Sequence, residues 1–163
     1  MMEIEIRPLR PEDQEAALDV VKSNYPNASA HEAFLNHCKA SFATEPASTA
    51  VHFLGAFIGA KIVGLAGYGK SSIASSIWGL TFDNVLPEYQ GQGIGGQLID
   101  ARLQKILELN ANMSELTALV SATPTRLWKG QGFKELKQDD EEERDPEEKV
   151  LLVKKLKIKE PKR

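Results

Sequence analysis

Four glycines within six residues constrain this chain more than any other feature of its sequence. They stand between a β-prone run and an amphipathic helical pattern, as Gly91, Gly93, Gly95 and Gly96. Because glycine lacks a Cβ atom, successive backbone N–H groups of such a turn can point at one anion. The turn also precedes a helix N-terminus, where the helix dipole favours negative charge. The spacing therefore predicts a cradle for a pyrophosphate group.

Two nucleotide-binding motifs use a similar turn, and the flanking residues argue against both. A Walker-type phosphate loop requires Lys-Ser or Lys-Thr after its last glycine, whereas this chain has Gln97 and Leu98 there. The glycine spacing also satisfies the dinucleotide fingerprint, but a Rossmann site needs an acidic ribose ligand at a strand end about 20 residues later. The next strand ends near Ser121 instead. A nicotinamide-dependent oxidoreductase is therefore disfavoured.

Hydrophobic periodicity predicts one α/β domain over residues 1–163. Helices begin where Pro, Ser or Thr precede an apolar 3.6-residue period, and strands show period-two alternation. In chain order we expect a strand over 3–7, a helix from Pro11, a helix over 30–42, a hairpin of strands 51–57 and 61–68, a strand over 77–86, a helix over Ile94–Leu109, a strand over 116–120, a short helix capped by Thr123 and Pro124, and strands over 133–136 and 150–158.

Composition and charge narrow the class of protein further. Cys38 is the only cysteine, which excludes an internal disulfide and a cysteine metal site. The net charge of −3 argues against nucleic-acid binding, since phosphate neutralisation needs a concentrated cationic face. Apolar runs stop well before the roughly 18 residues that a membrane span requires. The N-terminus lacks the pattern of a secretory signal. We therefore expect a cytoplasmic protein without metal, membrane or nucleic-acid partners.

The glycine turn and its lead-in resemble those of the GNAT family of N-acetyltransferases. The coenzyme A motif of that family runs Gln or Arg, two residues, Gly, one residue, Gly or Ala, and Gln90, Gly93 and Gly95 fit it. The lead-in Val85-Leu86-Pro87-Glu88-Tyr89 is also typical of the family. The order of the expected elements matches as well. The resemblance thus covers nearly the whole chain and implies the α/β GNAT fold, a mixed central sheet of about seven strands flanked by about four helices.

The resemblance implies that acetyl-CoA is the cosubstrate and that the acetyl group passes directly to a primary amine. It also implies that the strand before the turn offers a backbone N–H near Val85 to the thioester oxygen. The residues that it assigns to coenzyme A are Val85, Gln90, Gly91, Gln92, Gly93, Ile94, Gly95, Gly96, Ser121 and Trp128.

Two of these residues depart from the family pattern. Trp128 stands where the family often has a tyrosine that protonates the departing thiolate, and Ser121 stands where it often has an asparagine. An indole N–H is no acid near neutral pH, so the general-acid role is not transferred to Trp128. A CoA-binding sensor or interaction module without catalysis is therefore the alternative to an enzyme.

Asp83 is the only carboxylate from residue 77 to residue 86, the strand on which the family often carries its general base. It is the candidate base, with His52, Tyr68 or an ordered water as alternatives. The acidic segment 139–148 is expected to be a solvated loop that favours a small cationic acceptor by electrostatic steering, and 159–163 a basic tail. Strands at the end of the fold are compatible with a homodimer.

Overall fold

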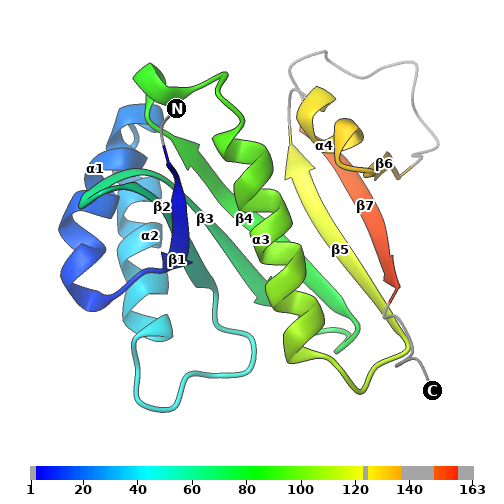
Figure 1. Cartoon of the computed structure of the whole chain (residues 1–163). Coiled ribbons are helices and arrows are strands. Elements are labelled where there is room, and N and C mark those ends of the chain that lie inside the picture. The colour runs from blue at the N-terminus through cyan, green and yellow to red at the C-terminus, as the bar shows by residue number, and fades with distance from the viewer. Residues whose placement is uncertain (1–2, 123–124, 137–148, 158–163) are drawn as a thin grey trace.

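The computed structural model describes residues 3–122, 125–136 and 149–157. A seven-stranded sheet forms its centre, with the strand order β1-β2-β3-β4-β5-β7-β6. Only β4 and β5 pair in parallel among these strands. The elements, labelled in Figure 1, are β1 (Glu5–Pro8), α1 (Gln14–Asn24), α2 (Ala28–Ser41), β2 (His52–Ile58), β3 (Lys61–Lys70), β4 (Ile77–Val85), α3 (Ile94–Leu109), β5 (Glu115–Ala122), α4 (Arg126–Gly130), β6 (Lys134–Glu135) and β7 (Val150–Lys157), with 3-10 turns at Pro11–Asp13 and Pro87–Tyr89.

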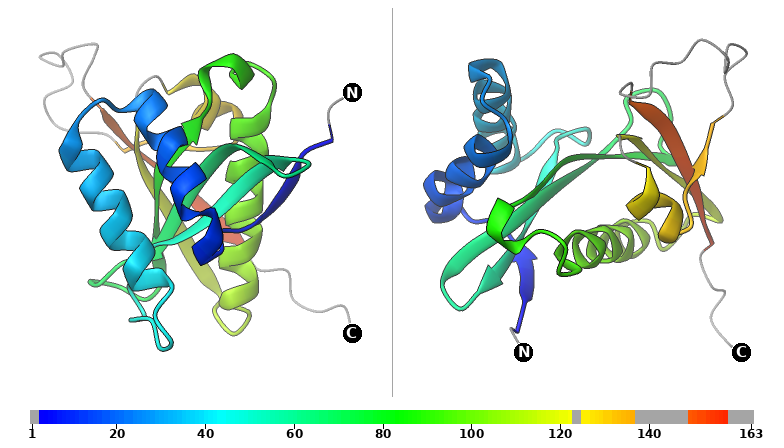
Figure 2. Two further views of the ribbon diagram at one scale, coloured as in Figure 1. Left: turned by 90° about the vertical axis from the view of Figure 1, so that its left-hand side faces the viewer. Right: turned by 90° about the horizontal axis from the view of Figure 1, so that it is seen from above.

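Helices cover both faces of the sheet, as the view from above in Figure 2 shows. One core cluster joins α1 and α2 to the sheet through fully buried side chains such as Val21 and Phe34. The other cluster joins α3 to the opposite face through Leu98, Ile99 and Ile106. The expected mixed sheet and its flanking helices are therefore confirmed. Within the described parts of the chain, no helix combines the length and the apolar character needed to cross a bilayer.

Local sequence signals placed most of these elements within two or three residues. The helix Ile94–Leu109 matches its predicted range, and Gly59 closes the β2–β3 hairpin with a φ of 58°. The helix expected from Pro11 begins instead with a 3-10 turn, in which the Asp13 carboxylate accepts hydrogen bonds from the Arg10 backbone N–H and the Arg7 guanidinium. The expected capping residues Thr123 and Pro124 lie outside the described residues, and α4 begins at Arg126.

The parallel pair β4 and β5 separates before either strand ends. Backbone pairing runs from Ile77 opposite Thr117 to Leu80 opposite Val120. Beyond those pairs β4 continues to Val85 and β5 to Ala122 without facing each other, and Figure 1 shows the two arrows diverging. The fold therefore opens a gap in the middle of its sheet, beside the glycine turn.

Candidate functional site

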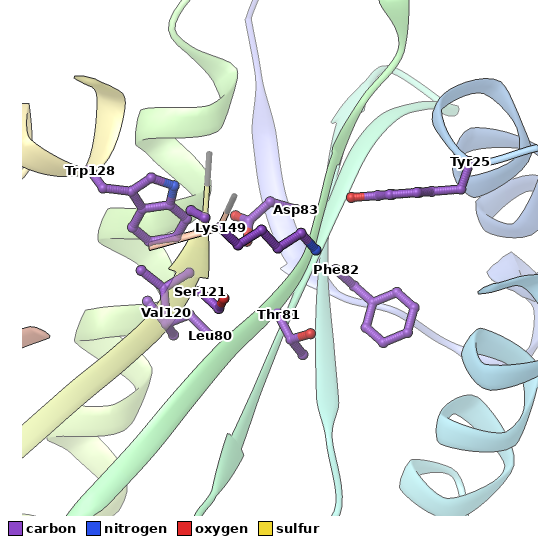
Figure 3. A pocket seen from close by; sticks show the side chains of 10 residues that line it. Tyr25, Leu80, Thr81, Phe82, Asp83, Val120, Ser121, Trp128 and Lys149 are labelled. Atoms are coloured by element: carbon purple, nitrogen blue, oxygen red, sulfur yellow. The ribbon is translucent and has the colours of Figure 1, made fainter. Parts of the chain in front are cut away.

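Side chains of the separating strands line a cavity of about 290 Å³. It lies between Thr81, Phe82 and Asp83 of β4 and Ser121 of β5, with Trp128 of α4 on one side. Figure 3 shows these side chains around the opening. Ser121, Trp128 and Asp83, which are far apart in the sequence, are thus brought to one site.

The cavity wall contains a bulge in β4. Thr81 pairs with Gly67 and Asn84 with Leu65, so Phe82 and Asp83 both lie opposite the single residue Ala66. Phe82 has a φ of 54°, the only positive value among the described non-glycine residues. Left-handed backbone costs a non-glycine residue about 1–2 kcal/mol, and a bulge leaves backbone groups out of the strand ladder. The bulge therefore leaves Phe82 and Asp83 out of the regular pairing with β3, and both residues line the cavity.

An arginine that the sequence reasoning did not single out holds Asp83 in place. Arg102 of α3 is fully buried, and its guanidinium donates to both carboxylate oxygens of Asp83. Arg102 Nε also donates to the Leu98 carbonyl and Nη1 to the Gly67 carbonyl, at 3.0 and 3.1 Å. The Asp83 side chain stays 36% exposed. Its carboxylate therefore faces the cavity on one side and a buried counter-ion on the other.

Trp128 is part of the hydrophobic core and of the cavity wall together. It is 5% exposed and meets the Phe133 ring edge to face at 5.1 Å. The Arg102 guanidinium lies 5.6 Å from its ring centroid, within cation–π range. The indole thus forms a rigid side of the opening.

A second cavity, of about 460 Å³, surrounds the glycine turn. Seven of the ten residues assigned to coenzyme A line it, together with Tyr89 and Leu127; the seven are Val85, Gln90, Gly91, Gly93, Ile94, Gly95 and Gly96. Gln92 is exposed beside this cavity. Leu127 of this cavity and Trp128 of the first are adjacent in α4, and both cavities are bordered by the C-terminal half of β4. The two cavities therefore border neighbouring positions of that strand, Asp83 at the first and Val85 at the second.

Glycine is required at two positions of this turn by backbone conformation. Gly91 and Gly93 have φ values of 78° and 84°. Gly93 is the N-cap of α3, and no side chain caps this helix end. The Ile94 side chain is buried in the core, so only its backbone faces the turn. The first N–H groups of a 16-residue helix are thus directed at the cavity without an internal partner.

A network of side-chain amides ties the turn to α1 and β4. The Val85 carbonyl accepts hydrogen bonds from Asn24 Nδ2 and Gln90 Nε2, both at 3.0 Å. Gln90 Nε2 also lies 3.2 Å from Asn24 Oδ1, and Asn24 Nδ2 lies 3.2 Å from Oδ1 of the buried Asn84. The Gln90 amide therefore fixes the start of the turn.

The other two candidate bases line neither of these cavities. Tyr68 is 5% exposed, and its ring lies 5.8 Å from that of His52. Burial raises the pKa of the Tyr68 phenol and lowers the pKa of the His52 imidazole. Neither residue lines a described cavity. In the described part of the chain no group of three or more His, Cys, Asp or Glu side chains is arranged to hold a metal ion.

Comparison with family models adds the deciding observation. The model of the acetyltransferase (GNAT) domain matches residues 11–145, which is most of the chain. The chain belongs to the GNAT acetyltransferase family. The family identified from the glycine turn is thus confirmed. A search of curated proteins found no match to this GNAT chain.

Solved structures share the GNAT fold at low sequence identity. A GNAT-family protein from Desulfovibrio desulfuricans superposes with a TM-score of 0.74 at 19% identity, covering 96% of this chain and all of the other. The PaiA N-acetyltransferase from Thermoplasma acidophilum, in complex with coenzyme A, has a TM-score of 0.67 at 21% identity over 95% of this chain and 100% of its own. A GNAT acetyltransferase from Brucella melitensis, in complex with acetyl-CoA, has 0.60 at 24% identity over 82% of this chain and 84% of its own.

Proposed function

We propose that this protein is an acetyl-CoA-dependent N-acetyltransferase that acts on a primary amine. The observation that carries the proposal is that the C-terminal half of β4 borders both the glycine-turn cavity and the cavity that Asp83 lines. The uncapped N-terminus of α3 and the glycines fit a pyrophosphate. From there the gap between β4 and β5 leads to Asp83. An extended thioester arm that starts at the turn ends beside this carboxylate.

The proposed reaction needs a neutral amine, a nearby carbonyl carbon and a donor for the oxyanion. Asp83 is the proposed base, because it is the one carboxylate among the described residues that line this cavity. It would take a proton from the acceptor ammonium on its exposed side. The amine nitrogen then bonds to the carbonyl carbon, and its second proton passes to solvent. The carbon–sulfur bond breaks, the thiolate leaves and takes a proton from solvent, and Asp83 returns its own proton to solvent.

The proposed oxyanion donor is a peptide N–H of the bulge at Phe82 and Asp83. The family resemblance implies a donor near Val85, which lines the second cavity; we propose the bulge because it lines the same cavity as Asp83. The bulge is the irregular part of β4 and lines the cavity. Trp128 is proposed to pack against the thioester arm, and Ser121 to contact it from β5.

We propose a primary amine as the acceptor. The acidic segment does not narrow this class of acceptor further. Residues 139–148, which favoured a cationic acceptor, lie outside the described residues, as does the tail 159–163. The alternative of a non-catalytic sensor rests on Trp128, whose indole supplies no acid, on Ser121 in the place of an asparagine, and on the lack of a glutamate in the strand before the turn. Because a thiolate is a fair leaving group, we favour the enzyme.

Coenzyme A binding can be tested with two glycine variants that share the same strain. Gly93→Ala places a Cβ on a residue with φ of 84°, and Gly59→Ala places one on a residue with φ of 58°; neither Cβ meets an atom within 4 Å. Both variants should lose about 1–2 kcal/mol of unfolding free energy. Only Gly93→Ala should weaken acetyl-CoA binding in calorimetry, by about tenfold or more. Equal affinities of the two variants would contradict the proposed pyrophosphate cradle.

Catalysis is tested by release of free CoA thiol from acetyl-CoA with a panel of primary amines. The enzyme proposal predicts release above the background without amine, and mass spectrometry should find the acetylated amine. Asp83→Asn should lower kcat/KM and change its pH profile, because a general base must be deprotonated to act. Tight acetyl-CoA binding without release for any amine would instead support the sensor.

A further inference from the structure

A third cavity, of about 180 Å³, adjoins the first on the side of the sheet that carries α1 and α2. Four residues, Tyr25, Thr81, Phe82 and Lys149, line both cavities. The space therefore extends away from Asp83, on the side of the bulge opposite Trp128 (Figure 3). It is smaller than the roughly 300–1,000 Å³ of pockets for drug-sized ligands. If the proposed transfer takes place at Asp83, the rest of a small acceptor molecule occupies this cavity.

The floor of this cavity is apolar and rigid. The Phe82 ring lies 5.7 Å from the Phe53 ring, 6.1 Å from that of Phe34 and 5.5 Å from that of His37. Ala30 of α2 adds a methyl group to the wall. Aromatic rings that are packed on several sides hold a fixed shape. The surface therefore suits an apolar substituent.

The charges of the described residues that line the two cavities do not suit a polycation. Lys149 lines both of them, and it has no ion-pair or hydrogen-bond partner among the described residues. Asp83 is the only carboxylate on their described walls, and both of its oxygens already accept hydrogen bonds from Arg102. A second ammonium group of an acceptor would thus meet Lys149 instead of a carboxylate. An anionic group there would gain an ion pair.

A hydroxyl and an ammonium group from opposite walls converge over this space. Figure 3 shows the Tyr25 side chain, at the end of α1, and the Lys149 side chain, which precedes β7, directed toward each other. The Tyr25 backbone is held at both its polar atoms: its N–H donates to the Val21 carbonyl at 2.8 Å, and its carbonyl lies 2.6 Å from His31 Nε2. A carboxylate between Tyr25 and Lys149 could accept from both.

We infer that the acceptor is a small amino carboxylate with an apolar side group. Its ammonium faces Asp83, its carboxylate binds Lys149 and Tyr25, and its side group lies on Phe82. This inference rests on the proposed acetyl transfer and specifies its substrate class. Lys149 and Tyr25 are then the residues that determine specificity, and they take no part in bond making.

The inference is tested with leucine and isopentylamine, which differ only in the carboxylate, and with spermidine as a polycation. Wild-type protein should show the highest kcat/KM for leucine. Lys149→Met should lower the ratio of kcat/KM for leucine to that for isopentylamine by about tenfold or more, mainly through KM, because one charge-assisted hydrogen bond is lost. Tyr25→Phe should lower this ratio less. Lys155→Met is the matched control, since this exposed lysine of β7 lines neither cavity, and it should leave the ratio unchanged.

A preference for isopentylamine or spermidine over leucine, or an equal ratio in wild type and Lys149→Met, would overturn the inference while acetyl transfer stands. Calorimetry of leucine with the protein–CoA complex separates the two proposals. One outcome is that leucine binds to the wild-type complex but not to Lys149→Met, while no amine is turned over. This outcome would refute the proposed acetyl transfer and support an amino carboxylate as the ligand. If leucine does not bind even to the wild-type complex, the ligand class is wrong.

Discussion

The ion pair of Arg102 and Asp83 predicts an asymmetric response to mutation. Arg102 is fully buried, whereas the Asp83 side chain is 36% exposed. Asp83→Ala leaves a buried guanidinium without its counter-ion, which costs about 3–5 kcal/mol in other proteins. Water can enter from the cavity, so we expect the lower end, about 3 kcal/mol. Since 1 kcal/mol shifts Tm by about 2–4 °C in a domain of this size, Tm should fall by about 6–12 °C.

Arg102→Met should cost less than Asp83→Ala. The replacement is apolar and of similar length, and the remaining carboxylate can be hydrated from the cavity. The losses are the hydrogen bonds to the Leu98 and Gly67 carbonyls, about 1–2 kcal/mol in total. In the Arg102→Met background, Asp83→Ala should cost less than about 1 kcal/mol, because no buried charge then lacks a partner.

Urea denaturation of the four proteins measures this coupling directly. The double-mutant cycle should give a coupling energy of about 2 kcal/mol, within the range for residues in contact. Glu108→Ala on the same helix is the control, since its ion pair with Lys105 is exposed and should contribute less than about 1 kcal/mol. Additive effects of the two single substitutions, within about 0.5 kcal/mol, would refute the reasoning.

Three further predictions concern other parts of the molecule. Burial lowers the pKa of His52 below 6.5. The neutral imidazole therefore contributes its full stability above about pH 6.5, and this contribution is lost as the pH falls through the lower folded-state pKa. Denaturation between pH 8 and pH 5 should show a smaller loss of unfolding free energy in His52→Gln than in the wild type. Asn24→Ala should weaken acetyl-CoA binding by about two- to tenfold, because it removes the contacts to Gln90 and Val85. Ser23→Ala should leave the affinity unchanged, since the Ser23 hydroxyl bonds only within α1. Equal affinities of the two variants in calorimetry would exclude a role of this network in acetyl-CoA binding. Burial raises the pKa of Cys38 to about 11, so alkylation at pH 8 should be slow until urea unfolds the chain, and rapid labelling of the native protein would contradict this.

Two positions show how far local sequence reasoning reaches into the site. Asp83 was identified because it is the only carboxylate of its strand, and Trp128 because it stands where the family often has a tyrosine. Both line the cavity. Arg102 escaped notice because one charged residue in an amphipathic helix normally faces solvent. Its burial was not apparent until the helix lay across the sheet with Asp83 beneath it.

The sequence by itself determined the glycine turn, the helix after it, the order of strands and helices, and the family. These features depend on backbone preferences and on periodicity over a few neighbouring residues. Both can be read from the sequence without knowledge of the fold. The tertiary structure alone decided the bulge at Phe82, the ion pair of Arg102 with Asp83, and the meeting of Tyr25 with Lys149 at one cavity. Those contacts depend on strand register and helix packing, which bring together residues that no local pattern connects.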